Sequence, residues 1–336
     1  MDTPAQPGKA TETPYEAPYS PDPEAGADAA PPRTEAPGEE APRSQPLGPA
    51  LMVVLGSACT SSSGGLIKLS GVSAGTAAFY RCVIALLVLA PLAYREIRRR
   101  GARPPRLQLI DLAAGLLLGV DFVCWAQSID ALGASIATVL LNIQLVVFPL
   151  LARLLSGTAL SRGYWVTVPF MLLGVALAGG AIGDPQPGSD PGAGVLYGTA
   201  AGVAFAGYLF LIRLGGEVRG PGKGRPIQPV CVSTAGAAVS AAVLGSLWTG
   251  LDFAPAASAW GWLVPMALFG QVLAWLFINP ALPRLSPSAG SALLLLQPVL
   301  AMLFGIGFLG ERPGLTQYAG CALVVLVVWR AGRADR

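Results

Sequence analysis

The sequence predicts an all-α integral membrane protein with ten transmembrane helices, arranged as two five-helix repeats of inverted topology. Three observations lead to this fold class: an apolar composition, regularly spaced apolar runs, and an internal repeat. Of the 336 residues, 53% are hydrophobic and 12% are charged, and the mean hydropathy is +0.58. Soluble domains contain about 25% charged residues, so we expect most of this chain to lie in a bilayer.

Residues 1–46 differ in composition from the rest of the chain. They are rich in Pro, Glu, Ala and Ser and contain almost no large aliphatic side chains. Such a segment cannot bury enough apolar surface to offset the entropy of ordering, so we expect a disordered cytoplasmic tail. The segment also lacks the basic start and apolar core of a signal peptide. A regulatory binding role for the tail is the alternative.

Apolar runs long enough to cross a membrane begin after this tail. A spanning helix needs about 20 mostly apolar residues. The sequence contains ten such runs, at residues 49–69, 74–94, 107–128, 133–153, 162–182, 193–213, 229–250, 259–281, 286–309 and 314–331.

The basic residues predict the orientation of these spans. Alternate links are rich in Lys and Arg, and the links between them carry acids with Arg312 as their one basic residue. Because basic links stay in the cytoplasm, both termini are expected there, in a plasma membrane protein. The basic links contain Arg95, Arg98, Arg99, Arg100, Arg103, Arg106, Arg153, Arg162, Arg213, Arg219, Lys223, Arg225 and Arg284; the acidic links contain Asp130, Asp184, Asp190, Asp252 and Glu311.

An internal repeat relates the two halves of the chain. The third and fourth spans contain Gly119–Trp125 and Ala134–Gln144, which resemble Gly270–Trp275 and Pro287–Gln297 in the eighth and ninth. The last five spans therefore repeat the pattern of the first five, and we expect the two repeats at residues 47–182 and 193–332. Because five is odd, the second copy enters the membrane from the opposite side, an arrangement that suits a carrier working by alternating access.

These residues together resemble a known family. Arg81 early in the second span, Gln297-Pro298, and Leu309-Gly310-Glu311-Arg312 are similar to the drug/metabolite transporter superfamily, EamA type. The resemblance implies secondary transport of a small molecule, commonly efflux of amino acids, related metabolites or toxic compounds. The first half carries Ser156-Gly157-Thr158 where the second carries Gly310-Glu311, so the resemblance implies no symmetric pair of glutamates.

Ionisable residues inside the spans are the first candidates for the transport site. A charge deep in a membrane is costly and normally faces a cavity or a partner, and Arg81 and Asp121 both lie inside their spans. If the two meet, they form either a transport switch or a permanent structural ion pair. Asp121 is the leading candidate if transport is coupled to protons. Lys68 is expected at the interface, and Asp111 and Glu311 in solvated or capping positions near helix ends.

Polar uncharged side chains form a second set of candidates. Amides offer both donors and acceptors, so they could recognise a zwitterionic or amide-bearing solute; helix-to-helix hydrogen bonding is the alternative. Gln144 and Gln297 occupy matching places in the repeats, where the two halves should approach a central cavity. The complete set is Gln127, Asn142, Gln144, Gln271, Asn279 and Gln297, together with Ser61, Ser62 and Ser63 in the first span and Tyr208 in the sixth.

Trp125 and Trp275 also occupy matching places, each near the end of its predicted span. They are expected to belong either to an interfacial aromatic belt or to the walls of the cavity. Gly115 with Gly119, and Gly198 with Gly202, present small faces for close helix packing.

Other functional classes find little support in the sequence. The five cysteines lie singly in apolar runs and there is no histidine, so we expect no metal site, no cofactor and no enzymatic activity. The net charge of +3 does not indicate a nucleic-acid partner. The expected partners are a small solute, the lipid bilayer and a coupling proton, and a homodimer is compatible with the sequence. A membrane scaffold or sensor that binds a solute without moving it is the alternative function.

Overall fold

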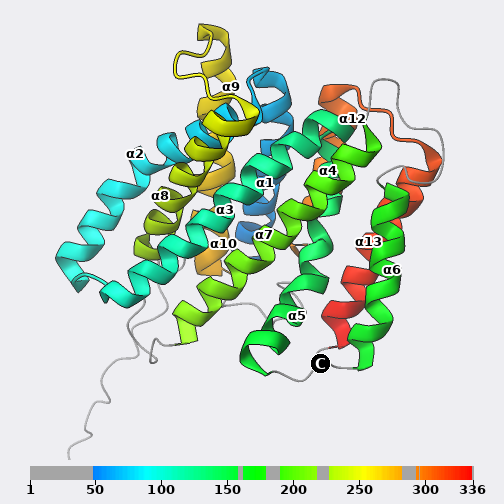
Figure 1. The fold of residues 1–336 in the computed structure, drawn as a ribbon, viewed down its shortest axis with the longest axis horizontal. Helices are drawn as coiled ribbons and strands as arrows, with labels where there is room; N and C mark the ends of the chain where they lie inside the picture. Colours follow the sequence, from blue (N-terminus) through cyan, green and yellow to red (C-terminus); the bar gives the residue numbers. More distant parts are fainter. Residues whose placement is uncertain are drawn as a thin grey trace, which may run out of the picture. The chain divides into compact units, whose positions relative to one another are not determined.

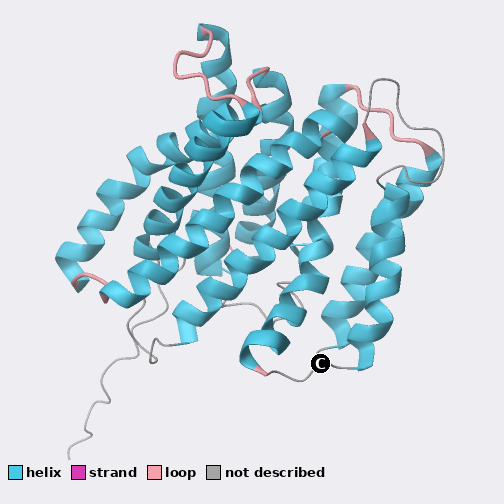
Figure 2. Cartoon of the chain, in the orientation of Figure 1, coloured by secondary structure: helices cyan, strands magenta, loops and turns pink. Residues whose placement is uncertain are grey.

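The computed structural model describes residues 48–157, 162–178, 190–217, 227–281, 293–294 and 296–334. By contacts the chain divides into Met1–Gln45 and Pro46–Arg336, and all described residues belong to the second unit. The tail predicted at residues 1–46 lies outside the described residues. The described part is helical, with no strand (Figure 2), which confirms the predicted all-α class.

The helices of the first half follow the predicted spans closely. A single 3-10 turn at Leu141–Ile143 interrupts the fourth span. The helices are α1 (Pro49–Ser70), α2 (Ala74–Arg100), α3 (Pro105–Leu132), α4 (Ala134–Leu140), α5 (Gln144–Ser156) and α6 (Arg162–Ala178).

The second half contains two π-helical turns, Gly245–Thr249 after α8 and Leu268–Leu273 between α9 and α10. The helices here are α7 (Pro191–Glu217), α8 (Ile227–Leu244), α9 (Ala257–Ala267), α10 (Ala274–Ala281), α12 (Leu296–Leu309) and α13 (Leu315–Ala334).

Seven helices or runs of helices are long and apolar enough to cross a membrane, so this is a multi-pass membrane protein. Shorter apolar helices lie at three further places where spans are predicted, within α6, α12 and α13. The seven are Pro49–Ser70, Ala74–Arg100, Pro105–Leu132, Ala134–Leu155, Pro191–Ile212, Ile227–Thr249 and Ala257–Ile278.

Local sequence signals explain where the helices end. Gly71 adopts φ 64° after α1, and Gly133 adopts φ 91° between α3 and α4. Positive φ is accessible to glycine at little cost, so each glycine ends a helix. The Ser73 hydroxyl accepts a hydrogen bond from the Thr76 N–H at 3.3 Å, which caps the start of α2. Pro105 occupies the first turn of α3, where no N–H is needed.

Helices of one half pack mainly against helices of the other (Figure 1). The most extensive contacts of α3 are with α7 and α8, those of α2 are with α8, and those of α1 are with α9, α10 and α12. The helices α6 and α13 pack as a pair. The core of the bundle is therefore formed jointly by the two halves.

The predicted small faces lie at these contacts. A Cβ atom at Gly115 would meet the backbone of Ser233, and one at Gly119 would meet the carbonyl oxygen of Ala237, so α3 and α8 touch backbone to backbone. Gly198 faces Leu140 and Gly202 faces Ile143. The structure thus confirms that these glycines allow close helix packing.

Candidate functional site

Arg81 lies at the meeting point of α1, α2, α3 and the π-turn Leu268–Leu273. Its side chain is buried, with 4% of the residue exposed. Nε donates to Oε1 of Gln271 at 3.3 Å, and Nη2 donates to the carbonyl oxygen of Gly270 at 3.0 Å. The guanidinium carbon lies 4.2 Å from the centroid of the Phe122 ring. Neutral groups therefore hold this buried cation, with an aromatic face beside it.

The π-turn provides both of these acceptors. In a π-turn the backbone hydrogen bonds run from residue i to i+5, which is often seen at functional sites. Gly270 also permits α1 to approach, because a Cβ atom there would meet the Ser63 hydroxyl. Gln271, only 1% exposed, extends the network by donating from Nε2 to the Thr234 hydroxyl at 3.3 Å. Arg81 is thus joined through Gln271 to α8.

Asp121 and Trp125 lie one helical turn apart on α3 and are 3% and 7% exposed. The Trp125 ring centroid is 5.8 Å from the guanidinium carbon of Arg81. Asp121 Oδ1 and Trp125 Nε1 are buried and have no hydrogen-bond partner among the residues described. Trp125 packs in the apolar core with Leu66 and Ile129, so the interfacial-belt interpretation is wrong for this tryptophan.

The hypothesised direct pairing of Arg81 with Asp121 is not formed in this conformation. Within the described ranges, the ion pairs are Lys68 with Glu311 and Arg103 with Asp111. Arg81 is bound instead by the side chain of Gln271 and the backbone of Gly270, groups that the sequence does not mark as partners of a cation.

The other predicted site residues differ in how near they lie to this cluster. The Asn142 amide donates to the carbonyl oxygens of Thr138 and Val139 in its own helix. Tyr208 packs in a buried apolar cluster with Phe122 and stacks on Phe205, with the ring centroids 5.6 Å apart.

Two of the matched positions differ in their surroundings. The Gln144 side-chain oxygen is buried and finds no partner in the described parts of the chain. The backbone oxygen of Gln297 accepts a bond from the Ser61 hydroxyl at 2.9 Å, which links α12 to α1. Trp275 is partly exposed on α10, and the side chain of Asn279 lies outside the described residues.

Sequence reasoning missed Thr234, Phe122 and Gly270 as members of this cluster, whereas Ser63 belongs to the polar set that the sequence predicts. The available signal is the repeat itself, because Gln271 and Asp121 each lie four residues before a tryptophan of the matched pair. Thr234 carries no such mark, and its contribution depends on how α8 packs against the π-turn.

Glu311 is buried and caps a helix in the other half of the chain. Its carboxylate accepts bonds from the N–H of Ala134 at 2.7 Å, the N–H of Ser135 at 3.2 Å and the Ser135 hydroxyl at 2.6 Å. The capping prediction is therefore confirmed, although the capped helix is α4 rather than a sequence neighbour. Lys68 Nζ lies 3.4 Å from Oε1 of Glu311, so the lysine is paired as well as partly exposed.

The prediction of a solvated or capping position is wrong for Asp111. This carboxylate is fully buried, and its Oδ2 lies 2.6 Å from Nη1 of Arg103. Arg103 also donates from Nη2 to the carbonyl oxygen of Gly215 at 3.0 Å. The short segment before α3 folds Arg103 back over the first turns of that helix, which places Asp111 against the end of α7.

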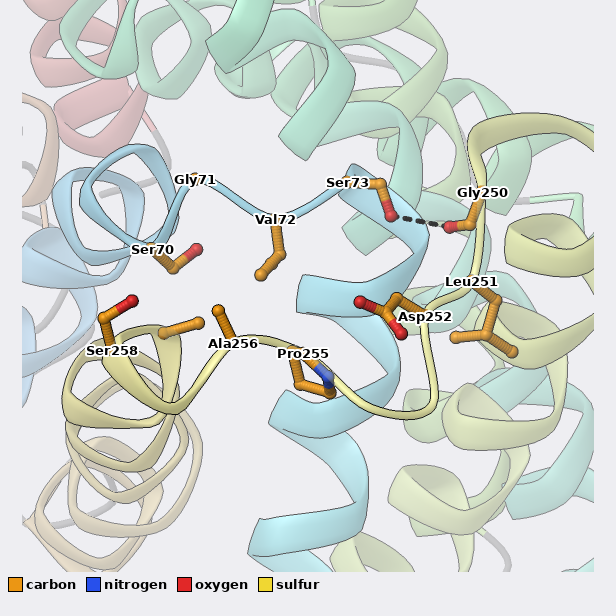
Figure 3. Close-up of a pocket in the computed structure, with 11 residues that line it drawn as sticks. Ser70, Gly71, Val72, Ser73, Gly250, Leu251, Asp252, Pro255, Ala256 and Ser258 are labelled. Carbon is orange, nitrogen blue, oxygen red and sulfur yellow. Dashed lines mark hydrogen bonds between the residues drawn. The ribbon is translucent and has the colours of Figure 1, made fainter.

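A separate pocket of about 460 Å³ lies at one end of the bundle, between the α1–α2 connection and the segment that leads into α9 (Figure 3). The Ser73 hydroxyl bonds to the carbonyl oxygen of Gly250 at 2.6 Å beside it. Its lining residues are Ser70, Gly71, Val72, Ser73, Gly250, Leu251, Asp252, Pro255, Ala256, Ser258 and Ala259, a set that contains none of the predicted site residues.

A bundle of apolar helices with buried polar groups between its two halves is typical of polytopic membrane proteins that carry solutes. The EamA-like transporter family model matches residues 47–180 and 192–331, which is most of the sequence. The chain therefore belongs to the EamA-like transporter family. Members of this family are transporters rather than enzymes.

Comparison with solved structures gives the same fold. A chain described as "Crystal structure of protein" matches with a TM-score of 0.57 and 17% sequence identity. The match covers 83% of this chain and 96% of that chain. A search of curated proteins finds no match.

Proposed function

We propose that the protein is a secondary active transporter that moves a small metabolite, an amino acid or related compound, across the plasma membrane by alternating access, in the direction of efflux. The observation that carries the proposal is the buried polar cluster around Arg81. It combines α2 and α3 of the first half with α8 and the π-turn of the second. A site shared between two halves can change its access when the halves move relative to each other.

The packing pattern supports ten spans in two inverted repeats, at residues 47–182 and 193–332. Exchanging each helix for its counterpart in the other half reproduces the main contacts between the two halves. For example, α1 packs on α9 and α10 as α7 packs on α3, and α1 packs on α12 as α7 packs on α5. This is the pattern expected of a twofold axis, and five spans per half would place that axis in the membrane plane.

Asp121 is the proposed site of proton coupling. It is buried near the middle of α3, one turn from Trp125, and Oδ1 has no partner within the described part of the chain. A carboxylate in such surroundings can take up a proton when the site opens to one side and release it when the site opens to the other.

Reconstitution in liposomes tests the proposal. Uptake of labelled amino acids and related metabolites is measured with and without an imposed pH gradient, and flux of one solute class that follows the gradient is expected. Asp121→Asn is expected to retain folding and lose the dependence on pH. Folded wild-type protein that gives no flux for any solute contradicts the transporter proposal, and binding without flux favours a scaffold or sensor. An Asp121→Asn protein with unaltered coupling removes the role of Asp121.

A further inference from the structure

Three buried hydrogen-bond donors in the polar cluster have no acceptor in the part of the chain that the structure describes. They are Nη1 of Arg81, Nε1 of Trp125 and the hydroxyl of Ser63, and each lacks a partner among the described residues. The three residues are 4%, 7% and 0% exposed. A buried donor without an acceptor destabilises the protein, and more strongly when the donor is charged. The presence of three such donors in one cluster therefore requires a structural or functional explanation.

The three donors come from three helices and lie around one place. Ser63 and Arg81 both lie against Gly270, because a Cβ atom built there would meet the Ser63 hydroxyl and lie 3.5 Å from Nη2 of Arg81. The Trp125 ring centroid is 5.8 Å from the guanidinium carbon of Arg81. A Cβ atom on Gly64, the neighbour of Ser63, would lie 3.4 Å from the Trp125 ring. The three residues therefore lie close together where α1, α2 and α3 meet.

The chemistry of these three donors determines which kind of ligand they can bind. Indole and guanidinium groups donate hydrogen bonds and cannot accept them. Gln271 and Gly270 occupy two of the five guanidinium N–H groups, on Nε and Nη2, and leave Nη1 free. Neither acceptor is charged, and no carboxylate of the described residues lies within ion-pair distance of Arg81, while Asp121 interacts with it electrostatically at longer range. A carboxylate offers the required acceptors and the required charge, and it fits the planar guanidinium.

We propose that Arg81, Trp125 and Ser63 form the subsite for a carboxylate group of the transported solute. The proposal rests on the transporter function above and specifies its substrate class. Asp121 Oδ1, a buried acceptor without a partner in the described structure, lies one turn away on α3 and receives a donor group of the same solute. All three donor residues are under 10% exposed, so the halves must part before the solute enters.

Matched ligands test the subsite without requiring transport. The full-length protein in detergent is heated with each of the twenty proteinogenic amino acids and, separately, with the carboxamide of each at the same concentration. At least one free acid is expected to raise the Tm, and its carboxamide to raise the Tm much less, because the amide has no negative charge for Arg81. Stabilisation by no free acid, or equal stabilisation by acid and carboxamide, overturns the inference.

Variants then locate the effect. Trp125→Phe keeps a ring near Arg81 and removes only the indole N–H, and it is expected to weaken binding of the free acid about 10-fold. Ser63→Ala removes the hydroxyl with little change in volume and is expected to weaken binding in the same direction. Arg81→Gln is expected to abolish the difference between acid and carboxamide.

A matched control is Trp262→Phe, since Trp262 is 40% exposed on α9, outside the subsite. This variant is expected to bind the acid as the wild type does. Acid binding that is unchanged in both Trp125→Phe and Ser63→Ala overturns the assignment of these donors. Selective acid binding without flux in liposomes contradicts the transporter function and leaves the carboxylate subsite standing.

Discussion

Single atoms set the geometry around Gly270. The absence of a side chain lets the Ser63 hydroxyl of α1 approach the π-turn, and the carbonyl oxygen of the same glycine accepts a bond from Arg81. One residue therefore combines a steric role with a polar one. Both roles depend on the position of the Gly270 backbone. A methyl group on Gly270 therefore affects the hydrogen bond to Arg81 as well as the packing against Ser63.

Gly270→Ala is expected to destabilise the protein by about 1–3 kcal/mol, because the added methyl group overlaps the Ser63 hydroxyl. The check is the Tm of the purified protein in detergent. Gly261→Ala is the matched control, since a Cβ atom there meets nothing within 4 Å. Equal Tm values for the two variants would show that the approach of α1 to the π-turn is loose.

Glu311 is a second residue whose role depends on individual bonds. Glu311→Ala leaves two buried N–H groups at the start of α4 without acceptors, at a cost of about 1–3 kcal/mol for each. Glu311→Gln keeps an oxygen acceptor and is expected to lose less. Chemical denaturation in mixed micelles provides the measurement.

The control for Glu311 is Asp190→Ala. Asp190 caps α7 through one bond, from the Ala193 N–H at 3.1 Å, and this cap is exposed. Its removal is expected to cost less than the loss of Glu311, because water replaces the carboxylate. If Asp190→Ala destabilises the protein more than Glu311→Ala does, this account is contradicted.

Among the helices, α3 and α8 touch backbone to backbone. Gly115 and Gly119 face Ser233 and Ala237, while Gly236 faces the carbonyl oxygen of Leu112 from the other side. Small residues on both helices allow the backbones to touch, and dispersion forces across this surface replace the hydrophobic effect that drives packing in water. Neither helix has flexible side chains here that could move aside.

Gly115→Val is therefore expected to prevent correct packing of α3 on α8, because the new side chain meets only backbone of Ser233. The expected result is loss of the monodisperse peak in size-exclusion chromatography after extraction. Gly307→Val is the control, since a Cβ atom at Gly307 on α12 meets nothing within 4 Å. A well-folded Gly115→Val protein would indicate that the two helices can separate freely.

At the scale of the whole molecule, the proposed orientation is testable from opposite faces. Single cysteines are introduced at Arg99 and at Ser258, both exposed, in a protein whose five native cysteines are replaced by alanine. A membrane-impermeant maleimide is expected to label Ser258→Cys in intact cells and Arg99→Cys only after the membrane is opened. The reverse labelling pattern would show that the topology is opposite to the one proposed. Labelling of both cysteines in intact cells would show that the two positions lie on the outer face.

The sequence alone predicts much of this fold and less of the site. Apolar runs and positions such as Gly71 and Gly133 locate the helices, because bilayer thickness and backbone geometry act locally. The partners of Arg81 and Asp111 depend instead on packing between distant segments. A π-turn that exposes the oxygen of Gly270 leaves no recognisable pattern in the sequence, and neither does the fold-back of Arg103.

The joint core of the two halves has a consequence for how the protein is made. The surfaces against which α1 and α3 pack belong mainly to α7, α8, α9, α10 and α12, which are translated later. The first helices therefore enter the membrane well before their partners leave the ribosome, and their small-residue and polar faces stay uncovered in the lipid during that interval. A chain that stops after α6 would retain these uncovered faces, which makes the nascent first half a natural client for membrane chaperones and proteases.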